Sequence, residues 1–152
     1  MKILLQRVRE AKASVSGSVV GSVGRGYLAL VGAAGGDDKP TADWLAEKTL
    51  GLRVFEDEDG RMNKSLEDVG GSILLVSQFT LLADCRRGRR PSFAGAAGPE
   101  LAKSLYEYLG ETLARRVPVA YGRFGAHMEV SLVNDGPVTV MLERSPEGGS
   151  GQ

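Results

Sequence analysis

One stretch near the middle of the chain, residues 72–81, constrains the fold more than any other. It begins as an uninterrupted apolar run over 73–76, which is typical of a strand buried on both faces of a sheet. It then ends abruptly in the hydroxyl and amide side chains of Ser77, Gln78 and Thr80. Because the end of a buried strand holds side chains more rigidly than a free loop does, such polar groups often belong to a functional site. The alternative is a strand that runs out into a polar turn, and the pattern alone does not exclude it.

The composition indicates one globular domain. The 152 residues are 42% hydrophobic and 25% charged, which is enough to bury a core without disulfides or metals. The 19 basic and 19 acidic side chains cancel, so any contact with nucleic acid must rest on a local patch. Cys85 is the only cysteine, which excludes an intrachain disulfide and favours a reducing, cytoplasmic location. No apolar stretch approaches the roughly 20 residues that span a bilayer, so we expect no membrane partner.

Apolar periodicity and turn signals predict the remaining elements. Strands are expected at 2–8, 11–15, 19–23, 27–31, 119–121, 129–133 and 138–142, and helices at about 40–52 and from Gly98-Pro99 to about 116. The first four strands form a meander that suits a barrel or a sandwich edge. The second helix is expected to serve core packing only. Residues 134–137 are predicted as a turn, because Asp-Gly favours positive φ and proline fixes the residue after it. We expect a single domain over 1–144 and a flexible Gly-rich tail at 145–152.

An arginine cluster follows the polar strand end. Arg86, Arg87, Arg89 and Arg90 lie within five residues and form the strongest local charge feature of the chain. A charge run is usually a solvated loop. Forked guanidinium groups also suit phosphate oxygens, and the position directly after the strand end favours a functional interpretation. Whether these arginines contact RNA stays open at this point.

The candidate nucleophiles near the strand end, Ser77, Thr80 and Cys85, have no evident base. His127 is the only histidine, and a lone histidine is more often a surface or structural residue than a catalytic one. No Gly-x-Ser-x-Gly elbow and no metal-ligand spacing is present, so we expect neither a metal nor a cofactor. The site that remains consists of backbone amides and hydroxyls, with arginine as a further candidate, and has no obvious acid or base. Such a site works by positioning and oxyanion stabilisation and leaves the proton chemistry to the substrate.

Two motifs carry a resemblance to a known family. Ser77-Gln78-Phe79-Thr80-Leu81 and Asn134-Asp135-Gly136-Pro137-Val138-Thr139 resemble the two signatures of the D-aminoacyl-tRNA deacylases. The similarity covers residues 1 to 143 in family order and includes Gln6-Arg7-Val8, Gly70-Gly71-Ser72, Arg90-Pro91-Ser92-Phe93, and Phe124-Gly125-Ala126 with Met128. The resemblance implies an α+β fold, a mainly antiparallel β-barrel-like domain with two flanking helices. It also implies a homodimer.

The resemblance further implies the reaction and the residues that serve it. The reaction is hydrolysis of the ester that joins a D-amino acid, or glycine mischarged on tRNA-Ala, to the 3′-terminal adenosine of tRNA. The catalytic positions are Ser77, Gln78, Phe79 and Thr80, and the substrate-binding and chiral-selection positions are Arg7, Phe124, Ala126, Met128, Gly136 and Pro137. The Gly136–Pro137 bond is implied to be cis, in a loop that enters the partner subunit's site and excludes L side chains with its carbonyl oxygens. Arg7 would brace that loop through charge-assisted hydrogen bonds.

Several alternatives remain at the level of sequence. Thr80 is either a nucleophile or a positioning residue beside a substrate-assisted mechanism. In the second case the ribose 2′-hydroxyl activates the reaction and backbone amides near Gln78 and Phe79 form the oxyanion hole, which the missing base favours. Three other functions compete: a related deacylase with relaxed chirality that removes mischarged L-alanine, a non-catalytic RNA-end binding module that uses the arginines, and a general Ser/Thr esterase. The intact 134–139 string resembles the chirally selective branch better.

Overall fold

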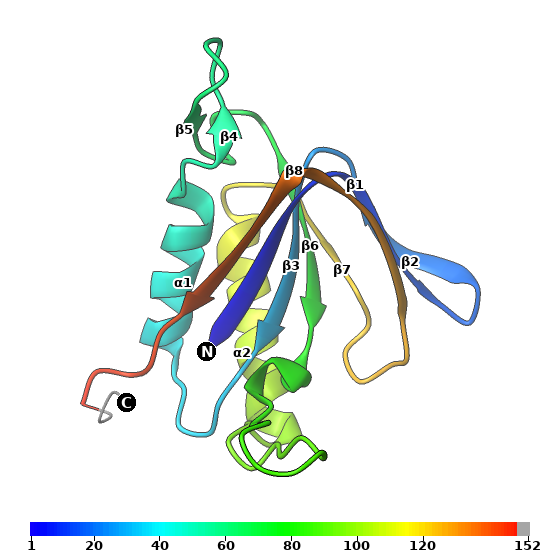
Figure 1. Ribbon diagram of the computed structural model, residues 1–152, viewed down its shortest axis with the longest axis vertical. Coiled ribbons are helices and arrows are strands. Elements are labelled where there is room, and N and C mark those ends of the chain that lie inside the picture. Colours follow the sequence, from blue (N-terminus) through cyan, green and yellow to red (C-terminus); the bar gives the residue numbers. More distant parts are fainter. Residues whose placement is uncertain (149–152) are drawn as a thin grey trace.

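The computed structural model describes residues 1–148, which form one curled sheet with two helices packed on one face (Figure 1). The sheet contains β1 (Lys2–Val15), β2 (Ser18–Val23), β3 (Gly26–Gly32), β6 (Ser72–Ser77), β7 (Val119–Tyr121) and β8 (Glu129–Glu143). The helices are α1 (Lys39–Gly51) and α2 (Pro99–Ala114); β4 (Phe55–Glu56) and β5 (Met62–Lys64) form a separate hairpin, and the short 3-10 helix η1 (Phe79–Leu82) follows β6. Neither helix in this part of the chain is long and apolar enough to cross a membrane.

The topology confirms the expected α+β class, with two flanking helices on a mainly antiparallel, barrel-like sheet. β1 pairs antiparallel with β8 on one side and with β2 and β3 on the other. β6 joins β3 and β7 by parallel pairing, so that part of the sheet is mixed. The sheet curls until β2 meets β7, where a Cβ on Gly21 would collide with the carbonyl oxygen of Tyr121. Glycine at that position therefore permits the approach that nearly closes the barrel.

The core explains why β6 is rigid. Ile73 and Leu75 enter the main cluster between the sheet and the helices, whereas Leu74 and Val76 enter a smaller cluster on the opposite face. All four side chains are at most 2% exposed. β6 is therefore buried on both faces, as the apolar run predicts. Its end, at Ser77, is fixed by packing on two sides.

Two predicted breaks in the chain are absent. The strands predicted at 2–8 and 11–15 are one continuous strand, β1. The predicted turn at 134–137 is wrong, because β8 continues through it as a bulge. Val8 pairs with Asn134 and Gln6 with Thr139, so residues 135–138 of β8 lie opposite Arg7 alone. The chain does not reverse here because β1 offers a pairing partner both before and after the bulge.

A buried ion pair connects the start of β1 with the segment before α1. The Met1 α-ammonium lies 2.7 Å from the Asp37 carboxylate and donates to the Arg144 carbonyl oxygen at 2.7 Å. Asp37 also accepts a hydrogen bond from the Ala34 amide at 2.6 Å. Both charged groups of the pair are almost fully buried. Removing one partner would therefore leave the other charge desolvated without compensation.

We expect Asp37→Asn to destabilise the protein by about 3 kcal/mol or more. For a chain of this size that loss lowers the melting temperature by roughly 10 °C. The matched control is Glu143→Gln, since Glu143 pairs with Lys2 at 3.8 Å on the surface nearby. An exposed pair of that kind contributes less than about 1 kcal/mol. Equal melting temperatures for the two variants in a thermal denaturation experiment would contradict the role assigned to the buried pair.

Candidate active site

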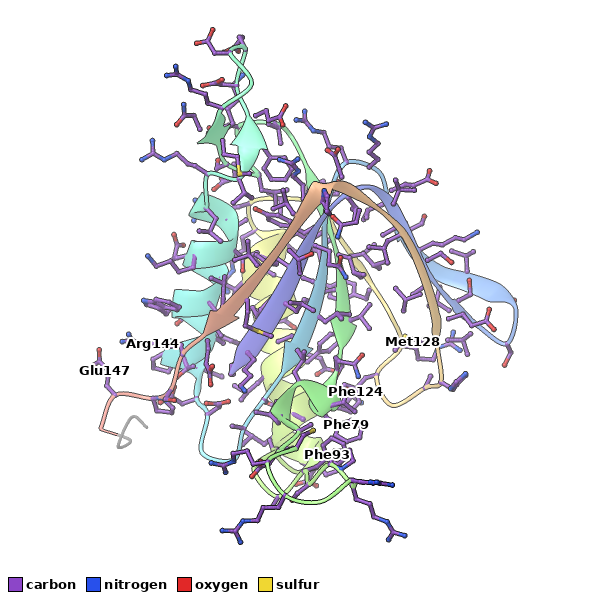
Figure 2. All side chains as sticks on the ribbon, viewed as in Figure 1. Phe79, Phe93, Phe124, Met128, Arg144 and Glu147 are labelled. Atoms are coloured by element: carbon purple, nitrogen blue, oxygen red, sulfur yellow. The ribbon has the colours of Figure 1, made fainter. Side chains whose placement is uncertain are left out.

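A pocket of about 570 Å³ opens where β6 ends. Its walls come from the end of β6 and η1, from the first turn of α2, and from the segment between β7 and β8 (Figure 2). The lining residues are Val76, Ser77, Gln78, Phe79, Ala97, Pro99, Ala102, Phe124, Gly125, Ala126, His127, Met128 and Val130. Most of them are apolar, and polar side chains come only from Ser77, Gln78 and His127. The pocket has the size and character of a small-molecule site, typically about 300–1,000 Å³.

The structure separates Thr80 from the other residues predicted at the strand end. Ser77, Gln78 and Phe79 line the pocket, whereas Thr80 is exposed and does not. The Thr80 hydroxyl oxygen accepts a hydrogen bond from the Gln78 side-chain amide. The Gln78 backbone amide donates to the Val31 carbonyl at 2.7 Å, so it is not free to serve the expected oxyanion hole. No described residue accepts from the Phe79 amide, which leaves that group available.

The segment between β7 and β8 brings Phe124, Ala126 and Met128 to the pocket, as the family resemblance implies. The Ala126 amide donates to the Arg123 carbonyl at 3.2 Å, and the Arg123 amide contacts the Met128 sulfur at 3.3 Å. The Phe124 ring packs against Tyr106 of α2, with ring centroids 5.9 Å apart. These contacts shape the segment into a compact wall. His127, which the sequence analysis did not favour as a catalytic residue, lies on the same wall.

Sequence reasoning missed the contribution of α2. We expected this helix to serve core packing only, and that expectation is wrong, because Pro99 and Ala102 of its first turn line the pocket together with the preceding Ala97. Leu105, Leu109 and Leu113 further along do pack in the core. The one available signal was the small side chain of Ala102 in the first turn, which is weak because the helix also contains Ser104, Gly110 and Ala114. A small residue there leaves space at the pocket wall.

A second cluster surrounds Arg7 and lies outside the pocket. Arg7 is only 4% exposed; its Nη1 donates to the Val54 carbonyl at 2.6 Å and its Nε to the Asp135 carbonyl at 3.0 Å. Gly136 has φ of +125°, and its peptide bond to Pro137 is cis. A Cβ on Gly136 would lie 2.8 Å from Arg7 Nη2. Arg7 therefore packs directly against the bulge of β8, and neither Gly136 nor Pro137 lines the pocket of its own chain.

Asn134 fixes the same bulge from within β8. Its side-chain oxygen accepts from the Val138 amide at 3.1 Å, and its side-chain nitrogen donates to the Thr139 hydroxyl at 3.2 Å and to the Gln6 side chain. The hydrogen bonds thus join the two ends of the bulge to each other and to β1. Gly136 and Pro137 themselves stay exposed at its tip. The result is a projecting loop with a tightly held base.

Comparison with known sequences identifies the family of this chain. The family model described as D-Tyr-tRNA(Tyr) deacylase matches residues 4–143. The chain belongs to this family. A protein of Thermomicrobium roseum named D-aminoacyl-tRNA deacylase is 59% identical over 152 residues, 99% of each chain. A protein of the same name from Geobacter sp. is 56% identical over 148 residues, 97% of this chain and 99% of its own.

Solved structures agree with the fold of this deacylase-family chain. The structure named c-Myc DNA Unwinding Element Binding Protein superposes with a TM-score of 0.91 at 39% identity, and the match covers 96% of this chain and 100% of that one. The structure of a probable eukaryotic D-amino acid tRNA deacylase gives a TM-score of 0.79 at 18% identity, over 93% and 97% of the two chains. The second likeness, at that identity, shows the fold alone.

The pocket of this deacylase-family chain is poor in ionisable groups. His127 is the only lining residue with an ionisable side chain, and no carboxylate lines the pocket. Tyr106 packs behind the Phe124 wall and donates its hydroxyl to the Leu75 carbonyl at 2.8 Å; burial raises the pKa of this phenol, so it stays protonated. In the part of the chain that the structure describes, no group of His, Cys, Asp and Glu is arranged to hold a metal ion. The pocket can therefore bind and orient a substrate but offers few groups that move a proton.

Proposed function

We propose that this chain hydrolyses the ester between a D-amino acid and the 3′-terminal adenosine of tRNA, releasing the free amino acid and tRNA. The observation that carries the proposal is the pocket at the end of β6, whose wall is built by Ser77, Gln78 and Phe79 of the first family signature. Its apolar lining suits an adenine base or an aminoacyl side chain. Family membership supports the class of reaction. No cofactor takes part in this proposal, and a cytoplasmic location follows from its tRNA substrate.

In the proposed mechanism the substrate supplies the proton chemistry. Thr80 is a poor nucleophile here, because it lies outside the pocket and its neighbour, the Gln78 amide, cannot accept a proton. The 2′-hydroxyl of the terminal ribose is adjacent to the ester and assists the attack of water on the ester carbonyl carbon. The free Phe79 amide stabilises the oxyanion that forms. Ser77 and Gln78 then position the ester, and Thr80 orients the Gln78 side chain.

The proposed chiral selection requires a second copy of the chain. The bulge that carries Gly136 and Pro137 is exposed and does not line the pocket of its own subunit, and we infer that it serves a neighbouring one. A row of apolar side chains, Leu4, Leu30 and Met141, crosses the sheet face that the helices leave open. Met141 is 48% exposed. Burying this row against a partner favours a homodimer.

Exclusion by shape explains why the base of the bulge is so firmly held. In the proposed homodimer, carbonyl oxygens of the bulge occupy the position that an L side chain would need. D-amino acids and glycine avoid the collision, which includes glycine mischarged on tRNA-Ala. Such discrimination works by excluding the L-aminoacyl substrate, and it requires that the bulge stays rigid when an L side chain collides with it. The hydrogen bonds of Arg7 and Asn134 provide that rigidity.

The test is hydrolysis of D-Tyr-tRNA and L-Tyr-tRNA, measured in parallel with the wild type and Thr80→Ala. We expect the wild type to hydrolyse the D ester only. Thr80→Ala should keep most of this activity, because Thr80 lies outside the pocket. Hydrolysis of small esters without RNA, abolished in Thr80→Ala, would instead identify a Ser/Thr esterase.

Two further outcomes would also overturn the proposal. Hydrolysis of both enantiomers, with L-alanyl-tRNA as a good substrate, would indicate a deacylase of relaxed chirality. Binding of tRNA without hydrolysis of either ester would indicate an RNA-end binding module. Sedimentation of the same preparation gives its mass, and a monomer that is fully active and selective would contradict the shared site.

A further inference from the structure

The loop between η1 and α2, residues 83–98, carries the most concentrated positive charge of the molecule. It contains four arginines and one aspartate in a chain with no net charge. Backbone hydrogen bonds between Asp84 and Ser92, at 2.7 and 2.9 Å, close its base. The four arginines therefore sit on a tip whose two ends are held together. All four are exposed.

Only one of these arginines has a carboxylate partner. Arg86 donates from Nε and Nη2 to the Asp84 carboxylate at 2.8 and 2.7 Å, and these bonds hold the pKa of Asp84 well below its usual range. Arg87, Arg89 and Arg90 form no ion pair and no side-chain hydrogen bond with any residue of the described part of the chain. Three neighbouring guanidinium groups without an anion repel one another. A ligand with several negative charges would relieve this repulsion.

The tip lies beside the entrance of the pocket. Phe93, three residues after Arg90, packs edge-to-face on Phe79 with ring centroids 5.0 Å apart, and Phe79 lines the pocket (Figure 2). Three residues of extended chain span only about 10 Å. The other end of the loop returns to the pocket at Ala97. Phe79 itself is 54% exposed, which leaves an aromatic surface between the arginines and the pocket.

We propose that Arg87, Arg89 and Arg90 bind the phosphates of the RNA nucleotides that precede the terminal adenosine, while the exposed face of Phe79 stacks on a base. The ligand rests on the proposed function, which places that adenosine in the pocket. Forked guanidinium groups match phosphate oxygens in a bidentate manner. Phosphate contacts set register without reading sequence, so the loop serves every tRNA alike. Stacking on an exposed aromatic ring likewise tolerates any base.

The first test replaces all three arginines by glutamine and measures the binding of uncharged tRNA as a function of salt. Each phosphate contact of a single strand contributes about 0.7 to the slope of log affinity against log salt, so the triple variant should lose about 2 from that slope. Between 50 and 200 mM salt its affinity should then fall about 15-fold less than that of the wild type. The matched control is Lys12, Arg53 and Arg61 changed together to glutamine. These are three exposed cations that form no ion pair with any residue of 1–148, and this control should keep the wild-type slope.

A second readout separates this loop from the pocket. D-tyrosyl-adenosine is the same ester without any phosphate, and the triple variant should hydrolyse it at the wild-type rate. With D-Tyr-tRNA its KM should rise at least tenfold while kcat is retained. An unchanged salt slope and an unchanged KM would overturn the inference about the loop. If the wild type hydrolyses neither ester, the proposed function fails, and the salt slope still decides whether the arginines bind phosphate.

Discussion

A D-Tyr-tRNA whose terminal adenosine lacks the 2′-hydroxyl is expected to be hydrolysed about 10³-fold more slowly than the natural ester by the wild-type protein. The reason is the shortage of proton-moving groups at the pocket. No carboxylate lines it, and Thr80 lies outside it with only the Gln78 amide as a side-chain partner. A general acid or base typically contributes 10²–10⁴-fold, so removing the substrate's own group removes a factor of that order. The measurement is single-turnover hydrolysis, divided by the spontaneous rate of each ester.

His127 decides whether this interpretation is complete. It is the only residue lining the pocket whose side chain is of a kind that acts as a general base. His127→Gln should therefore leave hydrolysis of the natural ester nearly unchanged and the 2′-deoxy ester equally slow. If His127→Gln abolishes hydrolysis while the 2′-deoxy ester reacts normally, the histidine is the base and substrate assistance is refuted. If Thr80→Ala gives that pattern instead, Thr80 is the nucleophile.

The pocket wall at the end of β6 was predictable from local pattern. The apolar run at 73–76 requires burial on both faces, and the abrupt change to Ser77 and Gln78 marks where that burial ends. Position along the strand then fixes which groups reach the rim. The opposite wall, at Phe124 and Met128, was predicted from the family resemblance and not from any local pattern in the sequence. This wall comes close to the end of β6 because the sheet curls between strands that are far apart in the chain. A local stretch of sequence carries no information about that curl.

The bulge shows the opposite case, in which a strong local signal gave the wrong structure. Asp135-Gly136-Pro137 has the composition of a reversing turn, yet β1 pairs with the chain on both sides of it and keeps it in one strand. The burial of Arg7 could not be predicted from the local sequence either. Strand alternation puts Arg7 on the same face as Ile3 and Leu5, but a charged side chain there is tolerated only because Val54 and Asp135 supply carbonyl acceptors. Those acceptors are 47 and 128 residues away in the chain.

Gly136→Ala is expected to reduce kcat/KM for D-Tyr-tRNA by about 100-fold, the usual effect of misplacing a site element by about 1 Å. The new Cβ would lie 2.8 Å from Arg7 Nη2 and 3.0 Å from Val138 Cγ2, and Arg7 cannot retreat without losing its buried hydrogen bonds. The ratio of D to L hydrolysis should fall as well, because the excluding wall has moved. The matched control is Gly60→Ala, where φ is +76° and a Cβ meets nothing within 4 Å. It carries backbone strain of about 1 kcal/mol without a steric collision and should retain both rate and selectivity.

A mixing experiment shows whether the bulge acts on its own pocket or on that of a partner. Ala126→Trp should fill the pocket and abolish hydrolysis while leaving the bulge intact. Gly136→Ala should displace the bulge while leaving the pocket of its own subunit intact. In a homodimer with shared sites, a mixed dimer contains one normal pocket facing one normal bulge. Co-expression of the two inactive variants should therefore restore activity at one of the two sites of each mixed dimer, with wild-type preference for the D ester. If each bulge serves its own subunit, every site in the mixture carries one defect and no activity returns.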